Sequence, residues 1–275
     1  MFKKRGETGF MNYLYSGHNT SRRLPFKEKL YYYFFVFATL YIEFGYKMVT
    51  SKQFSGTVRT ALLLAICVPL LLKFIKGRFH SQPLFLFIYF TIVIGISYLS
   101  DRDMKNYILL FVAIFVGFVT ASTIRFKDIA NIFVNVMTFL ALYSLLCFAL
   151  LILAPGVFNL FPVMYDPYNS LSATVHDMGF AVVLANAQNY RNFGFAWEPG
   201  AFSVLLGSAL YCCVSFYKRI DFRKVIILAV ALITTFSTTG YFVLIAIFIV
   251  AFKGGKRNIK TTIVFFVIAV LFVIA

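Results

Sequence analysis

Charged residues are scarce in this chain of 275 residues: 13% are Asp, Glu, Lys or Arg, whereas 61% are hydrophobic and 19% are aromatic. A typical soluble domain has about 25% charged residues. The sequence also lacks a Walker-type phosphate loop, a glycine-rich nucleotide fingerprint and a paired His/Cys ligand set. These absences argue against a soluble nucleotide- or metal-dependent enzyme, and no cofactor is expected. The composition indicates an integral membrane protein.

Cysteines are also few, and all four fall within apolar runs, where none has the spacing of a metal site: Cys67, Cys147, Cys212 and Cys213. They are expected to serve as small apolar residues. Residues 1–29 are polar and basic, without the apolar core or cleavage site of a signal peptide. The first hydrophobic helix is therefore expected to remain as an anchor.

The apolar residues are grouped in runs of about the length that a bilayer requires, roughly 20 helical residues. They predict an all-α, polytopic membrane protein with a basic tail (1–29), five transmembrane helices (30–153), a long extracytoplasmic loop (154–199) and further helices (200–275). A ninth helix begins near Thr261 and continues to Ala275, so an N-terminal fragment is expected. The eight complete spans are predicted at residues 30–49, 60–75, 84–99, 107–124, 129–153, 200–217, 225–237 and 240–252.

The net charge of +16 follows the predicted topology and does not form a nucleic-acid-binding patch. With a cytoplasmic N-terminus, all but six of the 26 Lys and Arg residues lie in cytoplasmic segments, as the positive-inside rule requires. Three of the six exceptions fall in the first outward loop, which fits the topology least well. The six are Lys47, Lys52, Arg59, Arg102, Lys105 and Arg191.

The long loop is rich in aromatic residues, including the only tryptophan, Trp197, and we expect it to fold against the outer membrane surface. Its charged residues are Asp166, Asp177, Arg191 and Glu198. His176, beside Asp177, is a candidate substrate-binding residue, although a loop histidine is more often solvated. Trp197 is a candidate for stacking on a sugar, and the alternative is an interfacial anchor.

The segment RNFGFAWEPGAF, residues 191–202, ends this loop. Proline favours the first helical position, so Pro199 is expected to open the sixth helix with Glu198 at its N-cap, where the helix dipole stabilises a carboxylate. Gly194 permits a tight turn that would bring Arg191 and Glu198 together. An outward-facing arginine offers a planar set of donors suited to phosphate.

A second polar feature interrupts the apolar stretch from Val225 to Phe252 at Ser237, Thr238 and Thr239. Each half is about 18 Å of helix, which is short for a span. We expect a helical hairpin whose tip stops near the outer leaflet under the cover of the long loop. In the alternative, the hydroxyl groups bond to their own helix backbone.

Two motifs, R-x-x-G-x-x-x-E-P-G-A-F from Arg191 to Phe202 and T-x-S-T-T-G-Y from Thr235 to Tyr241, resemble those of the O-antigen polymerase and ligase family of bacterial envelope proteins. Members of that family transfer a glycan from undecaprenyl pyrophosphate to a sugar hydroxyl, without metal or nucleotide, at the outer face of the cytoplasmic membrane. Many have a basic residue where Thr238 stands here, and a second long outward loop further along the chain.

The resemblance implies a glycosyltransferase in the bacterial cytoplasmic (inner) membrane that polymerises lipid-linked repeat units of a surface polysaccharide. Arg191 would contact the pyrophosphate, and Glu198 would either orient Arg191 or act as a base. The lipid bilayer is an expected partner, chain-length regulator and flippase proteins are candidate partners, and nucleic acid is not. The expected substrate-binding residues are His176, Gly194, Trp197, Ser237, Thr238 and Thr239.

Three alternatives remain open: a ligase that moves the finished chain to another acceptor, a polysaccharide transporter or flippase, and a non-enzymatic membrane scaffold. A transporter is expected to show inverted repeats and polar residues near the membrane midplane in both halves. Here the main midplane charges are Glu43 and Lys47, and their spacing of one helical turn predicts a simple ion pair.

Overall fold

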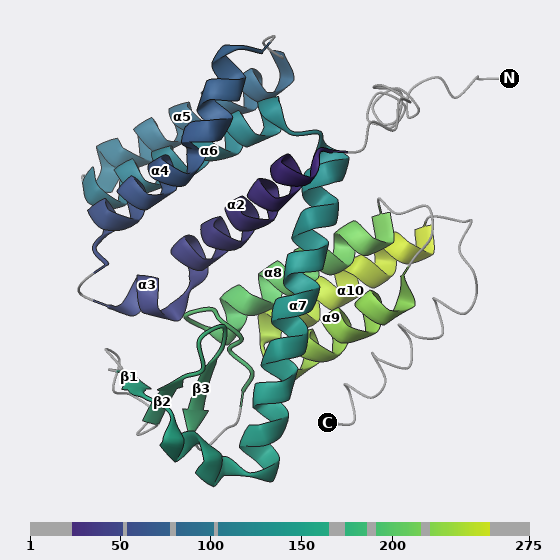
Figure 1. Cartoon of the computed structure of the whole chain (residues 1–275). Coiled ribbons are helices and arrows are strands. Elements are labelled where there is room, and N and C mark those ends of the chain that lie inside the picture. Colours follow the sequence, from purple (N-terminus) through teal and green to yellow (C-terminus); the bar gives the residue numbers. More distant parts are fainter. Residues whose placement is uncertain are drawn as a thin grey trace, which may run out of the picture.

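A computed structural model describes residues 24–51, 54–77, 81–101, 104–164, 174–185, 191–215 and 221–253 (Figure 1). Helices make up most of this part of the chain. The predicted basic tail as far as residue 23 and the predicted ninth helix from Thr261 lie outside the described residues.

Each of the eight predicted spans corresponds to a helix. Among the described residues, α4 and α7 are long and apolar enough to cross a membrane, and several other helices contain shorter apolar stretches. The helices are α2 (Phe26–Phe44), α4 (Gly56–Ile75), α5 (Ser81–Asp101), α6 (Met104–Thr123), α7 (Phe126–Leu153), α8 (Pro199–Ser215), α9 (Phe222–Thr234) and α10 (Thr238–Lys253).

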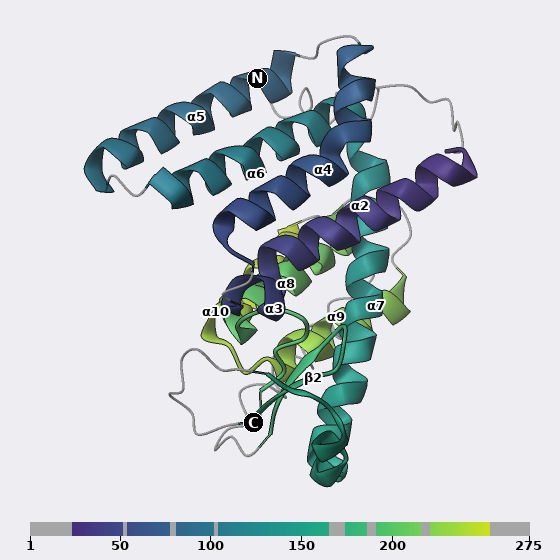
Figure 2. The same ribbon diagram turned by 60° about the vertical axis from the view of Figure 1, so that its left-hand side comes forward.

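The helices form two groups joined by α2 and α7. On one side, α2 packs against α4, which packs against α6, and α6 carries α5. On the other side, α7 packs against α8 and α9, while α10 packs mainly on α8. Figures 1 and 2 show α7 crossing α2 obliquely, with α4, α5 and α6 on one side of α2 and α8, α9 and α10 on the other.

The first predicted span is interrupted at Gly45, which separates α2 from the short helix α3 (Tyr46–Thr50). Gly45 is extended (φ −65°, ψ 131°), and its N–H donates to the Tyr41 carbonyl oxygen at 2.8 Å. A Cβ atom on Gly45 would lie 2.3 Å from that same oxygen. A side chain therefore does not fit at this break.

The break also overturns the predicted ion pair between Glu43 and Lys47, because the two residues no longer lie one turn apart on a continuous helix. Lys47 instead forms an ion pair with Asp177 of the long loop. The Glu43 carboxylate faces Arg59 of α4, with 3.9 Å between Oε2 and Nη2.

The predicted long loop contains a small sheet, so the all-α prediction is wrong here. After the 3₁₀ helix η1 (Pro155–Leu160) come β1 (Val163–Met164), β2 (Thr174–Asp177) and β3 (Val182–Ala185), which form an antiparallel sheet in that order. The strands are too short for their composition to stand out in a hydrophobic chain, but valine and threonine favour this extended geometry.

Both faces of the sheet are covered. Val183 and Ala185 pack with Phe158 of η1 and Leu151 of α7. On the other face, a second group packs together with the partly buried Trp197: Tyr46, Val175, Val182 and Leu184. Figure 1 shows the sheet beside the C-terminal part of α7.

The turn between β2 and β3 is fastened to α2 and α7 by Phe180. Its ring lies edge-on to Phe37 of α2 at 5.5 Å, and to Phe139 and Tyr143 of α7 at 6.1 and 5.9 Å between ring centroids. The Tyr143 hydroxyl also donates to the Met178 carbonyl oxygen at 2.6 Å. The loop is therefore held against the helices. Its predicted position at the outer membrane surface stays a prediction.

Phe158 of η1 is fully buried between the sheet and α7. We predict that Phe158→Ala lowers the free energy of unfolding by about 3–5 kcal/mol, because it leaves a cavity in this small core. Thermal unfolding of the purified protein in detergent micelles measures the change. Leu160→Ala, two residues away at an exposed position, is the matched control. Equal melting temperatures for the two variants would contradict this packing.

Candidate functional site

The candidate site is built around the segment 191–198, which joins the sheet to α8. Gly45 and Ala196 form an antiparallel β-bridge. Beside it, the Tyr46 N–H donates to the Phe195 carbonyl oxygen, and the Trp197 N–H donates to the Phe44 carbonyl oxygen, both at 2.9 Å. The segment is therefore docked by its backbone onto the break between α2 and α3.

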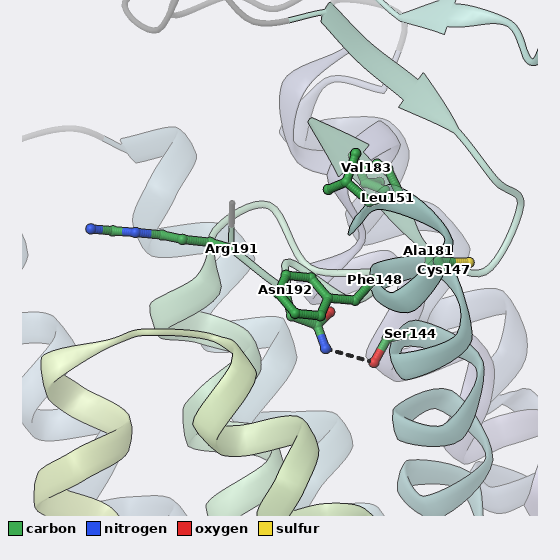
Figure 3. Close-up of a pocket in the computed structure, with 9 residues that line it drawn as sticks. Ser144, Cys147, Phe148, Leu151, Ala181, Val183, Arg191 and Asn192 are labelled. Atoms are coloured by element: carbon green, nitrogen blue, oxygen red, sulfur yellow. Dashed lines mark hydrogen bonds between the residues drawn. The ribbon is translucent and has the colours of Figure 1, made fainter. Parts of the chain in front are cut away.

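Asn192 connects this segment to two further helices. Its side-chain amide donates to the hydroxyl groups of Ser144 in α7 at 3.1 Å and Thr234 in α9 at 3.0 Å. Its backbone N–H donates to the Thr234 carbonyl oxygen at 2.9 Å. Asn192 is only 4% exposed, and Figure 3 shows its bond to Ser144. Asn192 was not among the predicted site residues, although an amide side chain in an apolar setting is a signal that the sequence carries.

Gly194 forms the tight turn that the sequence predicted. Its φ of +56° lies in the left-handed region, and its N–H donates to the Asn192 side-chain oxygen at 3.0 Å. A Cβ atom here would lie 2.5 Å from the ring of Phe202, which is buried in α8. Both the conformation and the close approach require glycine, so the part that Gly194 plays in this structure is to shape the segment.

Arg191 and Glu198 do not form an ion pair within the described part of the chain, so the predicted pairing is wrong. The turn at Gly194 and the docking onto α2 carry Glu198 to the start of α8. Arg191 stays at the other end of the segment, is exposed, and interacts electrostatically with Tyr241 of α10. Figure 3 shows its guanidinium group directed away from Ser144 and Asn192.

Glu198 precedes Pro199, the first residue of α8, as predicted, and its carbonyl oxygen accepts from the Phe202 N–H at 3.2 Å. Its carboxylate lies beside Gly200, together with the hydroxyl of Ser237. A Cβ atom on Gly200 would be 3.5 Å from Glu198 Oε1 and 3.7 Å from Ser237 Oγ. The start of α8 therefore meets the link between α9 and α10.

The second motif forms that link, which confirms the predicted break between the two helices. Phe236 has a left-handed φ of 45°, and α10 begins at Thr238. Ser237 is buried, whereas Thr238 and Thr239 are exposed. The bonds between Asn192 and Thr234 cover the end of α9, as predicted for the long loop.

The two aromatic candidates of the loop lie in different environments. Trp197 is partly buried and packs against the sheet and the helix core. His176 lies in β2 and is only 3% exposed, so the expectation of a solvated ring is wrong. Its Nδ1 lies 3.3 Å from the Phe161 carbonyl oxygen, and its ring lies against Phe158. In this conformation His176 packs within the small core beside the sheet.

A small pocket adjoins Asn192 and Ser144 and is otherwise lined mainly by apolar side chains of α7 and β3 (Figure 3). It has room for about one water molecule, which is too little for a sugar ring. Among the described residues, no group of three His, Cys, Asp or Glu side chains is arranged to hold a metal ion.

We predict that Asn192→Ala lowers the free energy of unfolding by about 1–3 kcal/mol, because it leaves buried hydrogen-bonding groups in the segment and the two helices without a partner. Thermal unfolding in detergent micelles provides the measurement. Asn159→Ala, at an exposed position in η1, is the control and should leave the melting temperature unchanged. A similarly unchanged melting temperature for Asn192→Ala would show that this residue does not hold the site together.

Comparisons of the chain with protein-family models, curated protein sequences and solved structures find no match. The relation to the O-antigen polymerase and ligase family therefore remains a prediction from the two motifs.

Proposed function

We propose that the protein is a membrane glycosyltransferase that joins undecaprenyl-pyrophosphate-linked repeat units of a surface polysaccharide. The supporting observation is that the two motifs of the resemblance, about 35 residues apart in the sequence, meet in space. Gly200 of the first motif lies beside Ser237 of the second. A Cβ atom on Gly240 would lie 3.2 Å from the Cβ of Ser203, just after the first motif.

In this proposal α2 and α4 to α8 cross the cytoplasmic membrane with the N-terminus in the cytoplasm. α9 and α10 form a hairpin that enters from the cytoplasmic side and turns near the outer leaflet. The first outward loop fits the positive-inside rule least well, but two of its cations have carboxylate partners. Lys47 pairs with Asp177, and Arg59 faces Glu43. The positive-inside rule counts Lys and Arg and gives carboxylates little weight, so these pairs satisfy the two charges locally without improving the fit to the rule.

The length of α9 supports a position of the two motifs near the outer leaflet. With 13 residues, α9 extends about 20 Å, less than the hydrocarbon core of about 30 Å. Its C-terminal end would therefore stop short of the outer surface. Because Asn192 bonds to the carbonyl and hydroxyl oxygens of Thr234 at this end, the segment closes the recess above it.

Arg191 is assigned to the pyrophosphate of the lipid carrier. Its guanidinium group is exposed, and its side chain is directed away from the buried bonds of Asn192. A planar guanidinium group can donate two parallel hydrogen bonds to a phosphate, which would stabilise the charge that develops on the leaving group.

Glu198 is assigned as the base that accepts the proton of the attacking sugar hydroxyl. A carboxylate that forms an ion pair is a poor base. Among the described residues, the Glu198 carboxylate forms no ion pair and accepts no side-chain hydrogen bond. The Ser237 hydroxyl nearby provides a polar neighbour. Thr238 and Thr239 are exposed, so they remain candidates for contacts with the glycan.

We predict that a strain lacking the complete gene displays surface glycan of single-repeat length, and that Arg191→Ala reproduces this pattern at normal protein abundance. Gel electrophoresis of surface glycan is the measurement. Arg191→Lys retains the charge but not the planar donors, so partial elongation is expected. Arg223→Ala, at an exposed position at the start of α9, is the control.

Full-length ladders from the Arg191→Ala strain would remove Arg191 from the mechanism. If the strain lacking the gene displayed not even single repeat units at the surface, the result would instead favour the flippase.

We predict that Glu198→Gln slows polymerisation by about 10²- to 10⁴-fold while the lipid-linked substrate still binds, because the amide cannot accept the proton. An in vitro assay with the purified full-length protein should show the loss in kcat and not in KM. If Glu198→Gln turned over at the wild-type rate, Glu198 would not be the base, and its role would be limited to the structure at the start of α8. A melting temperature equal to that of the wild type is the control for folding.

A further inference from the structure

The far end of α7 and the 3₁₀ helix η1 expose large apolar side chains that no described element covers. Leu153, the last residue of α7, is 81% exposed, and Leu160, the last residue of η1, is 84% exposed. Ile152 and Val163 are also among the exposed large hydrophobic residues. Exposed large apolar side chains also occur along most of the helices, so this end of α7 and η1 continues the apolar surface of the helices.

The burial pattern of η1 shows which side belongs to this surface. In a 3₁₀ helix, residues three positions apart lie on the same side. Phe158 is directed into the small core and is fully buried. Val157 and Leu160 share a second side, and Gly156 and Asn159 share the third; all four are exposed. One exposed side is therefore apolar, and the other carries a polar side chain.

The chemistry of the surrounding sequence identifies what the apolar side contacts. From Ile129 to Tyr165, through all but the first turn of α7 and the whole of η1, the sequence contains no Asp, Glu, Lys, Arg or His. A surface that docks a soluble protein has a polar rim with charged residues. An apolar stretch with no charged residue that continues from an apolar helix matches hydrocarbon instead.

The length of α7 makes contact between η1 and lipid geometrically possible. Its 28 residues extend about 42 Å, whereas the hydrocarbon core is about 30 Å thick. After the charged first turn, the apolar part from Ile129 to Leu153 extends about 38 Å, and a tilt of roughly 40° would keep it within that thickness. Figures 1 and 2 show α7 crossing α2 obliquely, which fits a tilted helix.

We propose that the Val157 and Leu160 side of η1 is immersed in the outer leaflet, so that η1 is an interfacial anchor, while Asn159 faces water. This anchor holds the three-stranded sheet at the surface of the outer leaflet. The inference rests on the membrane placement of α7 in the proposed function, but not on glycosyl transfer.

Single cysteines test the proposal in the purified full-length protein, reconstituted in a large excess of phosphatidylcholine. The variants Leu160→Cys and Asn159→Cys differ by one position on η1, and both positions are exposed, so the substitutions leave the core intact. A membrane-impermeant maleimide should label Asn159→Cys at least about tenfold faster, because a thiol in lipid does not form the reactive thiolate. The unchanged protein gives the background from the native cysteines.

A fluorescence measurement avoids the dependence on thiol chemistry. The only tryptophan is first removed by Trp197→Phe, and Leu160→Trp or Asn159→Trp then supplies a single reporter. Phospholipids brominated in their acyl chains should quench the tryptophan at position 160 strongly and the one at position 159 weakly.

Equal labelling and equal quenching at the two positions would overturn the proposal. Protection of Leu160→Cys in intact cells but not in pure lipid vesicles would also overturn it, since a protein partner would then cover this side. Leu146→Cys, at an exposed position in the middle of α7, separates the two proposals. Labelling of Leu146→Cys would refute the placement of α7 in the membrane. Protection of Leu146→Cys together with labelling of Leu160→Cys would refute only the anchor.

Discussion

The hydrogen-bonding groups left open at helix ends are the constraint on which this structure depends. α2 ends, α9 ends, and α8 and α10 begin in one region, and each end leaves backbone groups without partners inside the helix. The segment 191–198 supplies several of the missing partners. Asn192 bonds to Thr234 at the end of α9, and Trp197 bonds to Phe44 at the end of α2. In a membrane, where water is not available to take their place, such bonds are obligatory.

This constraint separates the residues of the segment into two groups. Asn192, Gly194 and Phe195 are committed to shaping the segment and docking it on the helices. Arg191 and Glu198 lie at its two ends, outside these bonds. A rigid backbone with a cation at one end and a carboxylate at the other suits a transfer reaction, in which the leaving group and the attacking hydroxyl need different chemistry.

The same region of the structure pairs two cations with carboxylates. The break at Gly45 turns Lys47 toward Asp177 of the loop, while Glu43 remains on α2 opposite Arg59. The aromatic contacts of Phe180 hold the same loop against α2 and α7. Together these contacts connect the helix bundle to the sheet, so the loop and the helices form one structure at this end of the molecule.

The positions of the eight helices, the start of α8 at Pro199 and the break near Ser237 were all predictable from the sequence. Long apolar runs, a proline and a cluster of hydroxyl residues act through local geometry, which one stretch of chain decides by itself. Their crossing of a membrane and the glycosyl transfer remain proposals. The sheet, the break at Gly45 and the burial of His176 were not predictable, because short strands and a single glycine carry little signal in a chain this apolar.

The relation between Arg191 and Glu198 shows most clearly what the sequence could predict and what it could not. The sequence placed both residues beside Gly194 and correctly predicted a turn there, but the turn alone does not decide where its two ends point. That direction depends on contacts with Gly45, Ser144 and Thr234, which are 42 to 151 residues away from Asn192 or Ala196. The sequence by itself determined the helices and the residue types at the candidate site. Only the tertiary structure decided which of those side chains are buried as support and which stay free, because bonds between distant segments set that division.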